Sequence, residues 1–267
     1  MSLHTHLTRL AVAGALVLPL LSMSGCGSGD VHAAVPETPV AEVTAVLVHG
    51  AWADGSSWSR ITPLLQGRGI KVVAVQLNRN SLREDALIVR RTIEAQTGKV
   101  VLVGHSYGGS VITEAGDDDK VGALVYVAAF APGDGESISD LISPYPPGAW
   151  QAGLVADSSG YLRLDPGTYA TYFANDLPKG EAAVLASSQG PLLGSVLQDK
   201  VTSAAWKTKV SYWALSSNDQ MIPAVLQQRE AVRINARVTT IDGGHTELLS
   251  HPKEVAAVIL DAVDHLQ

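Results

Sequence analysis

Residues 100–110 read VVLVGHSYGGS, an apolar run that ends abruptly in a cluster of glycines around one serine. The run from Val100 to Val103 is typical of a buried strand, and the residues after Ser106 have a helical pattern. Gly104, Ser106 and Gly108 fit G-x-S-x-G, which is typical of a sharp turn between a strand and a helix. The stretch therefore predicts a serine in a strained backbone conformation, exposed where a strand of a sheet ends.

Similar apolar runs recur along the chain at residues 43–48, 70–75, 99–103, 122–128, 210–215 and 237–241. Helix candidates lie between them at residues 57–66, 81–95, 107–115, 223–234 and 252–266. This alternation predicts an α/β fold, a mostly parallel sheet of about six strands flanked by helices. Residues 131–209 contain no clear core strand and are too long for a loop, so they predict a helical cap inserted after the fourth strand. The core is then assigned to residues 43–130 and 210–267.

Size and charge limit the partners that the chain can have. With 267 residues, 46% of them hydrophobic, it can bury one substantial core. The formal net charge is -7 without a block of Lys and Arg, which argues against a nucleic-acid surface. The Asp117–Asp119 run is interpreted as a solvated loop, so no metal is expected. The expected partner is a neutral or apolar small molecule.

The first residues have the pattern of an export signal. Arg9 precedes an apolar run at residues 10–21, which is too short to span a bilayer and predicts a signal peptide over residues 1–25. Residues 23–26 read MSGC and resemble the lipobox of bacterial lipoproteins, in which the cysteine, here Cys26, is lipidated. Cleavage after Ala33 is the alternative and would remove Cys26. Both interpretations predict an exported protein. If Cys26 is lipidated, residues 26–42 are expected to form a tether, and the lipid at Cys26 is the only expected contact with a membrane.

A serine nucleophile needs a base and a carboxylate that orients this base. Ligand sites of parallel sheets lie beyond the carboxyl ends of the strands, so these positions supply the candidates. His245 follows strand 237–241 in DGGHTELLSHP, and Asp219 follows strand 210–215 in SSNDQMIP. The order Ser, Asp, His supports this choice. The alternatives are His251 for the base and Asp242 or Glu247 for the acid.

Acyl transfer also needs two N–H donors for the oxyanion. One is expected from Tyr107, which follows Ser106 at a helix N-terminus. The other is expected from Ala51 in HGAW, which follows strand 43–48. Trp52 and the aromatic residues of the cap predict an apolar pocket. His49 and the histidine before Ser106 are interpreted as structural residues that fix the loops.

Residues 43–266 resemble the α/β-hydrolase fold. The blocks HGAWADGSSW, GHSYGG, SSNDQMIP and GGHTELLSHP are similar to those of the branch that holds plant methyl esterases, the salicylate-binding esterase and hydroxynitrile lyases. The resemblance implies Ser106 as nucleophile, His245 as base, Asp219 as acid, and Ala51 and Tyr107 as oxyanion donors. It implies a serine esterase for small esters that needs no cofactor.

Departures from the family pattern separate the chemistries of this branch. Hydroxynitrile lyases carry Thr and Lys at the positions of Gly50 and Thr246, so the resemblance argues against lyase activity. Ser106 excludes the mechanisms that use an aspartate nucleophile. Cofactor-free perhydrolysis and non-catalytic binding of a small ligand are both compatible with the same residues.

Overall fold

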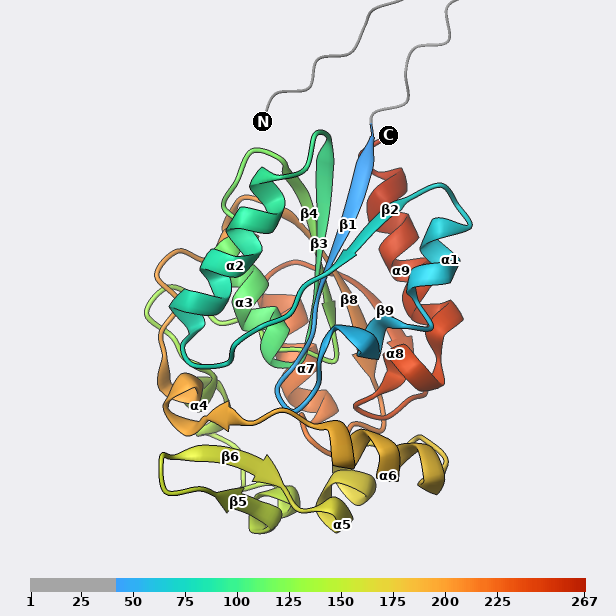
Figure 1. Cartoon of the computed structure of the whole chain (residues 1–267). Helices are drawn as coiled ribbons and strands as arrows, with labels where there is room; N and C mark the ends of the chain where they lie inside the picture. Colours follow the sequence, from blue (N-terminus) through green and yellow to red (C-terminus); the bar gives the residue numbers. More distant parts are fainter. Residues whose placement is uncertain (1–41) are drawn as a thin grey trace, which may run out of the picture. The chain divides into compact units, whose positions relative to one another are not determined.

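A six-stranded sheet runs through the protein in the order β2-β1-β3-β4-β8-β9 (Figure 1). Each neighbouring pair of strands is parallel, which confirms the predicted fold class. The strands are β1 (Val43–Val48), β2 (Lys71–Ala74), β3 (Lys99–His105), β4 (Val121–Val127), β8 (Val210–Ser216) and β9 (Arg237–Ile241). This computed structural model describes residues 42–267, which form one compact unit. The predicted signal peptide, Cys26 and the tether as far as residue 41 lie outside the described residues.

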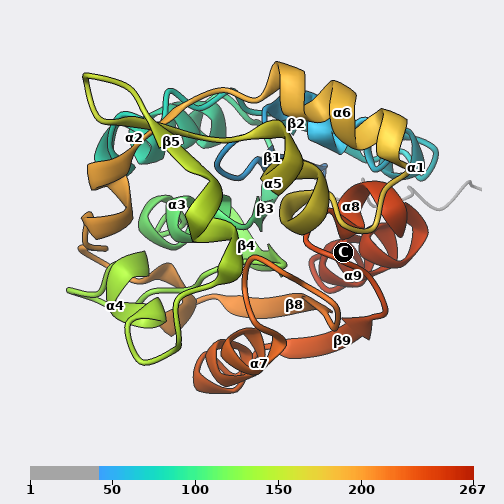
Figure 2. The same ribbon diagram turned by 90° about the horizontal axis from the view of Figure 1, so that it is seen from below.

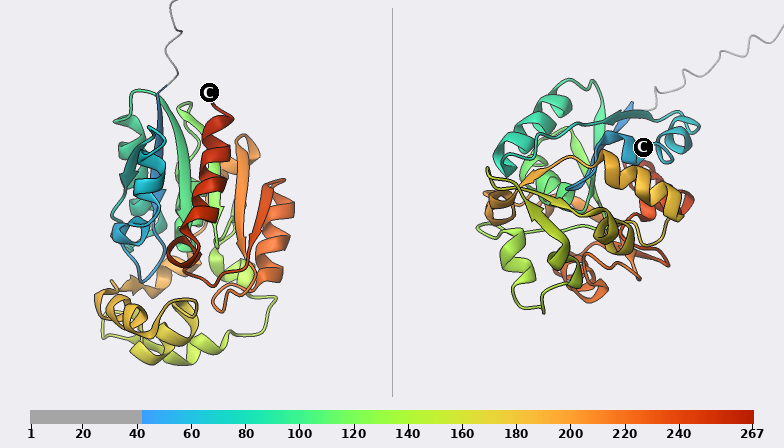
Figure 3. Two further views of the ribbon diagram at one scale, coloured as in Figure 1. Left: turned by 90° about the vertical axis from the view of Figure 1, so that its right-hand side faces the viewer. Right: turned by 60° about the horizontal axis from the view of Figure 1, so that its bottom comes forward.

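Helices cover both faces of the sheet. Side chains on β1 and β3 point alternately to the two faces, as the pleat requires, so each strand supplies both hydrophobic clusters. One cluster packs against α2 (Leu82–Glu94), α3 (Tyr107–Ala115) and α7 (Ala224–Arg233). The other packs against α1 (Thr62–Gln66) and α9 (Pro252–Asp264), which lie on the near side of the sheet in the left view of Figure 3. None of the helices described is long and apolar enough to cross a bilayer.

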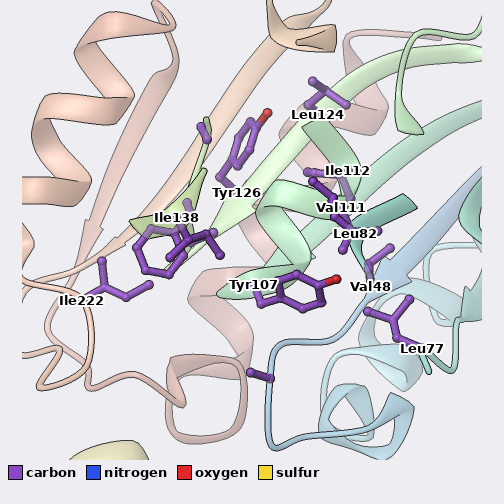
Figure 4. Close-up of a cluster of buried hydrophobic side chains, with 14 of the residues drawn as sticks. Val48, Leu77, Leu82, Tyr107, Val111, Ile112, Leu124, Tyr126, Ile138 and Ile222 are labelled. Carbon is purple, nitrogen blue, oxygen red and sulfur yellow. The ribbon is translucent and has the colours of Figure 1, made fainter. Parts of the chain in front are cut away.

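The Tyr107 ring lies in the first of these clusters. Figure 4 shows it near Val48 of β1, Leu82 at the start of α2 and Val111 of α3. The residue that follows the predicted nucleophile is therefore fixed by the core of the protein.

One predicted helix, residues 57–66, forms two pieces instead. A 3-10 turn η1 (Gly55–Trp58) precedes the short α1, in which Pro63 occupies the first turn. Proline has no N–H and is tolerated only at the start of a helix, so a continuous helix through Pro63 is disfavoured.

The segment 131–209, called the cap segment below, lies over the carboxyl ends of the parallel strands (Figures 1 and 2). It contains α4 (Ile138–Ile142), α5 (Pro166–Thr168), α6 (Lys179–Ser188) and several short turns of 3-10 or π helix. It also contains an antiparallel sheet of β5 (Leu154–Ala156), β6 (Tyr161–Leu164) and β7 (Leu192–Leu193), which the sequence pattern did not predict. Its position places the cap segment against the loops that carry the candidate residues.

Candidate functional site

Ser106 occupies a sharp turn between β3 and α3. Its backbone has φ 54° and ψ −122°, a region that residues other than glycine rarely adopt. A Cβ on Gly104 would lie 2.5 Å from the Gly108 carbonyl oxygen, and one on Gly108 would lie 2.5 Å from the Val48 carbonyl oxygen. Both glycines are therefore required by close backbone contacts. Strain of this kind costs about 1–3 kcal/mol and persists only where the surrounding structure fixes it.

The three residues predicted to form a catalytic triad lie together. His245 Nε2 is 3.0 Å from Ser106 Oγ, and His245 Nδ1 is 2.9 Å from Asp219 Oδ2. All three residues are buried. The prediction that Ser106 is exposed is therefore wrong: only 6% of its surface is accessible, and residues of the cap segment line the cavity beside it. They follow β3, β8 and β9, whose carboxyl ends lie at the same edge of the sheet. The structure thus brings the three candidates into one hydrogen-bonded chain.

The contacts of Asp219 fix both the carboxylate and the tautomer of His245. Asp219 Oδ1 accepts hydrogen bonds from the N–H groups of Met221 (2.7 Å) and Ile222 (2.9 Å). Asp219 Oδ2 also accepts one from Gln227 Nε2 of α7 at 2.9 Å. An ionised carboxylate only accepts hydrogen bonds, so His245 Nδ1 is assigned the proton and Nε2 presents its lone pair to Ser106. The sequence pattern did not predict a role for Gln227, which lies in α7, the helix that follows Asp219.

Two further buried histidines hold the loops of the site. His105 Nε2 donates to the His245 carbonyl oxygen at 2.8 Å. His49 Nδ1 donates to the Gly50 carbonyl oxygen (2.8 Å), and its Nε2 accepts from the Leu77 N–H (3.0 Å). Burial lowers the pKa of His49 to about 4 and the pKa of His105 well below its ordinary value. Both rings are therefore neutral at neutral pH, which fits a structural role.

The two predicted oxyanion donors line the same cavity as Ser106. Ala51 lies in the loop after β1, and Tyr107 is the first residue of α3, where N–H groups have no partner within the helix. Within residues 42–267, neither N–H donates to another backbone group. Both donors are thus free to bind a negatively charged oxygen beside the serine.

The Tyr107 side chain turns away from the reaction site toward a buried carboxyl group. Its hydroxyl donates to Asp85 Oδ2 at 2.7 Å, and Asp85 Oδ1 accepts from the N–H groups of Asn78 (2.9 Å) and Arg79 (3.0 Å). Burial raises the pKa of Asp85 and, together with the nearby carboxylate, raises the pKa of Tyr107 well above its ordinary value. Sequence reasoning missed Asp85, because a single acidic residue in a helix is normally exposed.

An apolar cavity of about 50 Å³ adjoins Ser106 and His245. Its described lining residues include no Asp, Glu, Lys or Arg. The Trp52 indole is fixed at one wall, because its Nε1 donates to the Leu162 carbonyl oxygen in the cap segment at 2.9 Å. The apolar part of the lining consists of Ala51, Trp52, Phe130, Ile138, Ile142, Trp150, Leu197, Met221 and Ile222.

The alternative candidates occupy different positions. His251 Nδ1 contacts Ser250 Oγ at 2.8 Å. Asp242 accepts from Asn218 Nδ2 at 2.5 Å. Glu247 is buried, and neither of its carboxyl oxygens has a hydrogen-bond partner among the residues described; burial, followed by the charges of nearby carboxylates, raises its pKa well above the ordinary value. None of the three residues takes the place of His245 or Asp219.

In the described part of the chain, no cluster of His, Cys, Asp and Glu side chains is arranged to hold a metal.

Comparisons with known proteins agree with this fold. The family described as "Alpha/beta hydrolase family" matches residues 45–258. The chain is 27% identical to a probable hydrolase, R7, of Phoma sp., over 81% of this chain and 96% of the relative. It is 34% identical to salicylic acid-binding protein 2 of Nicotiana tabacum, over 38% of this chain and 44% of the relative. It is 25% identical to the alpha-hydroxynitrile lyase of Arabidopsis thaliana, over 79% of this chain and 93% of the relative.

Solved structures show the same architecture. Polyneuridine aldehyde esterase superposes with a TM-score of 0.73 at 20% identity, covering 83% of this chain and 99% of that structure. A methylesterase from Arabidopsis superposes with a TM-score of 0.69 at 22% identity, covering 84% of this chain and 99% of that structure. The resemblance to plant methyl esterases, the salicylate-binding esterase and hydroxynitrile lyases is therefore confirmed.

Proposed function

The chain belongs to the alpha/beta hydrolase family, and from this premise we propose that it is a serine hydrolase that cleaves carboxylic esters. The observation that carries the proposal is the hydrogen-bonded chain from Ser106 Oγ through His245 to Asp219. Ser106, at one end of these hydrogen bonds, lines an apolar cavity. Ala51 and Tyr107, whose N–H groups are unpaired, line the same cavity. Nucleophile, base, orienting acid and oxyanion donors are all supplied by residues of the described chain.

The proposed reaction has two stages. In the first, His245 Nε2 takes the proton of Ser106 while Oγ attacks the ester carbonyl carbon, and the Ala51 and Tyr107 N–H groups bind the oxyanion. The imidazolium then donates this proton to the alcohol oxygen as the C–O bond breaks, which leaves an acyl-serine. In the second, His245 takes a proton from water, hydroxide attacks the acyl carbon, and the carboxylic acid leaves as Ser106 regains a proton.

The cavity suggests the class of ester. Because its described lining carries no charged side chain, an ionised substrate group would lose its hydration without compensation. We therefore propose small, neutral esters with apolar substituents. The names of several relatives point to ester cleavage, among them methylesterase 2 of Arabidopsis thaliana and a carbendazim hydrolyzing esterase of Nocardioides sp..

Lyase activity fits the site less well, although one relative is named a hydroxynitrile lyase. Thr246 follows the base and donates its hydroxyl to Asp176 at 2.5 Å. It supplies no positive charge to stabilise a leaving cyanide. Release of cyanide from mandelonitrile would support the lyase, and tight ligand binding without turnover would support a non-catalytic binding protein. Peroxide as acceptor in place of water would give a perhydrolase with the same residues.

The decisive test is Ser106→Ala, assayed with p-nitrophenyl acetate and butyrate. We expect kcat to fall by at least about ten-thousandfold, because the nucleophile is removed. The matched control is Ser110→Ala: Ser110 is also a buried serine, but it lies within α3 and outside the lining of the cavity. Full activity of Ser106→Ala would refute the proposal. A panel of neutral esters with increasing acyl length, together with lactones and amides, would then define the substrate.

We also propose that the protein is exported to the cell envelope. The proposal rests on the signal-like run at residues 10–21 and on Cys26 in MSGC. Lipidation of Cys26 would attach the enzyme to a membrane surface, whereas cleavage after Ala33 would release it.

A further inference from the structure

The cap segment contacts the loop that carries His245 through one carboxylate, that of Asp176. Asp176 lies between η3 (Tyr169–Phe173) and α6. Its Oδ2 accepts the Gly244 N–H at 2.9 Å, and its Oδ1 accepts the Thr246 hydroxyl at 2.5 Å. The Ser250 hydroxyl also donates to Oδ2. Because Gly244 and Thr246 flank His245, one side chain of the cap segment binds a backbone N–H on one side of the proposed base and a side-chain hydroxyl on the other.

The neighbouring residue contacts the loop of the acid. Asn175 Nδ2 donates to the carbonyl oxygen of Asn218, the residue before Asp219, at 3.2 Å. The approach of the two segments is close: a Cβ on Gly244 would lie 2.3 Å from Asn175 Oδ1 and 2.8 Å from Asp176 Cγ. A side chain on Gly244 would therefore displace the Asn175 and Asp176 side chains. The two loops that carry base and acid therefore meet at Asn175 and Asp176.

An aromatic side chain from the same stretch packs on the imidazole. The Phe173 and His245 rings have centroids 4.9 Å apart and are inclined by 72°, an edge-to-face contact. Phe173 is buried. Two residues of the cap segment therefore contact this loop: Asp176 binds the residues on either side of His245, and Phe173 packs against its imidazole ring.

We propose that Asp176 is a positioning residue that holds His245 in line with Ser106 and Asp219, and so makes triad geometry depend on the cap segment. The proposal rests on the proposed function. Hydrogen bonds to a carboxylate are stronger than those between neutral groups, so three donors on one carboxylate fix the loop firmly. Asp176 does not line the cavity. Its loss should therefore lower kcat, through misplacement of the base, and should leave KM nearly unchanged.

The first test compares Asp176→Ala with Asp176→Asn in ester hydrolysis. We expect Asp176→Ala to lower kcat about tenfold to a hundredfold, the range that small misplacements of catalytic groups produce, with KM within about twofold of wild type. Asp176→Asn retains one acceptor oxygen and should recover part of the loss. Thr246→Val removes a single donor at nearly constant volume and should cause a smaller loss, which keeps the test valid if Asp176→Ala folds poorly.

The matched control is Asp157→Ala. Asp157 is also a carboxylate of the cap segment, and it accepts the N–H groups of Ser159 (2.8 Å) and Tyr161 (3.0 Å) within its own turn. We expect its activity to equal that of wild type. Wild-type kcat in both Asp176→Ala and Thr246→Val, or the same loss of kcat in Asp157→Ala, would overturn the proposal.

A second measurement does not depend on turnover. Hydrogen exchange of the peptide that contains Gly244 and the low-field proton resonance of His245 Nδ1–H report the loop and the bond to Asp219. In Asp176→Ala we expect faster exchange at Gly244 and a broadened or shifted resonance, with neither change in Asp157→Ala. Unchanged exchange and resonance would overturn the positioning role. If the wild-type enzyme cleaves no ester, these signals still test the role of Asp176; if Ser106→Ala abolishes activity and Asp176→Ala does not, only the positioning role fails.

Discussion

Glu230 is a buried carboxyl group whose ionisation should weaken the fold at neutral pH. It lies on α7 with 1% of its surface exposed, and Arg233 donates to its Oε2 at 2.5 Å. Burial raises the pKa of Glu230 from its ordinary value of 4.5 to about 7, more than the neighbouring arginine lowers it. The stabilising contribution of such a raised pKa is present below 4.5 and is lost as the pH rises through 7. A difference between 4.5 and about 7 corresponds to about 3 kcal/mol of unfolding free energy.

The substitution Glu230→Gln keeps the size and one acceptor oxygen and removes this titration. Measured by urea denaturation from about pH 4.5 to about pH 8, its stability relative to wild type should increase by about 3 kcal/mol. The matched control is Glu136→Gln, because Arg233 also donates to Glu136 Oε2, at 2.6 Å. Burial alone would raise the pKa of Glu136, but hydrogen bonds from the Gly133 N–H and Arg233 outweigh it and lower the pKa. Its contribution is present at neutral pH and is lost as the pH falls, so Glu136→Gln should lose stability relative to wild type as the pH rises. A pH-independent difference for Glu230→Gln, or the same sign for both variants, would refute this reasoning.

Two further predictions concern Tyr107, which follows the sharp turn at Ser106, and the N-terminal segment. Tyr107→Phe removes one of the hydrogen bonds to the buried Asp85 and should lower the unfolding free energy by about 1.5–3 kcal/mol, the range for hydrogen bonds to charged groups. Urea denaturation measures it, and wild-type stability would show that the bond contributes nothing. Cys26→Ser should move the protein from the membrane fraction to the soluble fraction, because the lipid would no longer be attached. Identical fractionation of wild type and variant would reject the anchor.

The fold could be predicted because buried parallel strands are continuous apolar runs, as β1, β3, β4 and β8 are. The edge strands β2 and β9 are more exposed. The ends of the strands were harder to place. β3 was expected to end at Val103, but pairing continues through Gly104 and His105, which lie opposite Tyr126 and Val127 of β4. In the sequence alone, a glycine and a histidine look like the end of an apolar strand. In the fold, pairing with β4 keeps both residues in the strand. The short strands of the cap segment were not predicted, because β5 and β7 span only 3 and 2 residues, too few to form a recognisable strand pattern.

The candidate site also contains residues that the sequence predicted and residues that it did not. The proximity of Ser106, Asp219 and His245 could be predicted because each lies in the turn or loop that follows a strand, and parallel strands bring their carboxyl ends to one edge. Gln227, Asp85 and Asp176 could not be found, because their partners are distant parts of the fold and no local pattern marks them. Gly244 shows how such a residue could be recognised. It follows another glycine just before the base, and the structure explains it by the close approach of the cap segment.

The loop that carries His245 is bound by two different parts of the fold, β3 and the cap segment. His105, at the end of β3, donates to the carbonyl oxygen of His245, and Asp176 of the cap segment binds the residues on either side of it. The two contacts involve different groups of the loop around His245, and under the proposed positioning role both keep His245 Nε2 directed at Ser106. His105 binds only the carbonyl oxygen of His245 in this loop. Asp176 of the cap segment binds the Gly244 N–H and the Thr246 hydroxyl. Loss of the Asp176 contacts alone would therefore leave His245 bound to His105 and Asp219, and it would leave the strained turn at Ser106 supported by its glycines and β4.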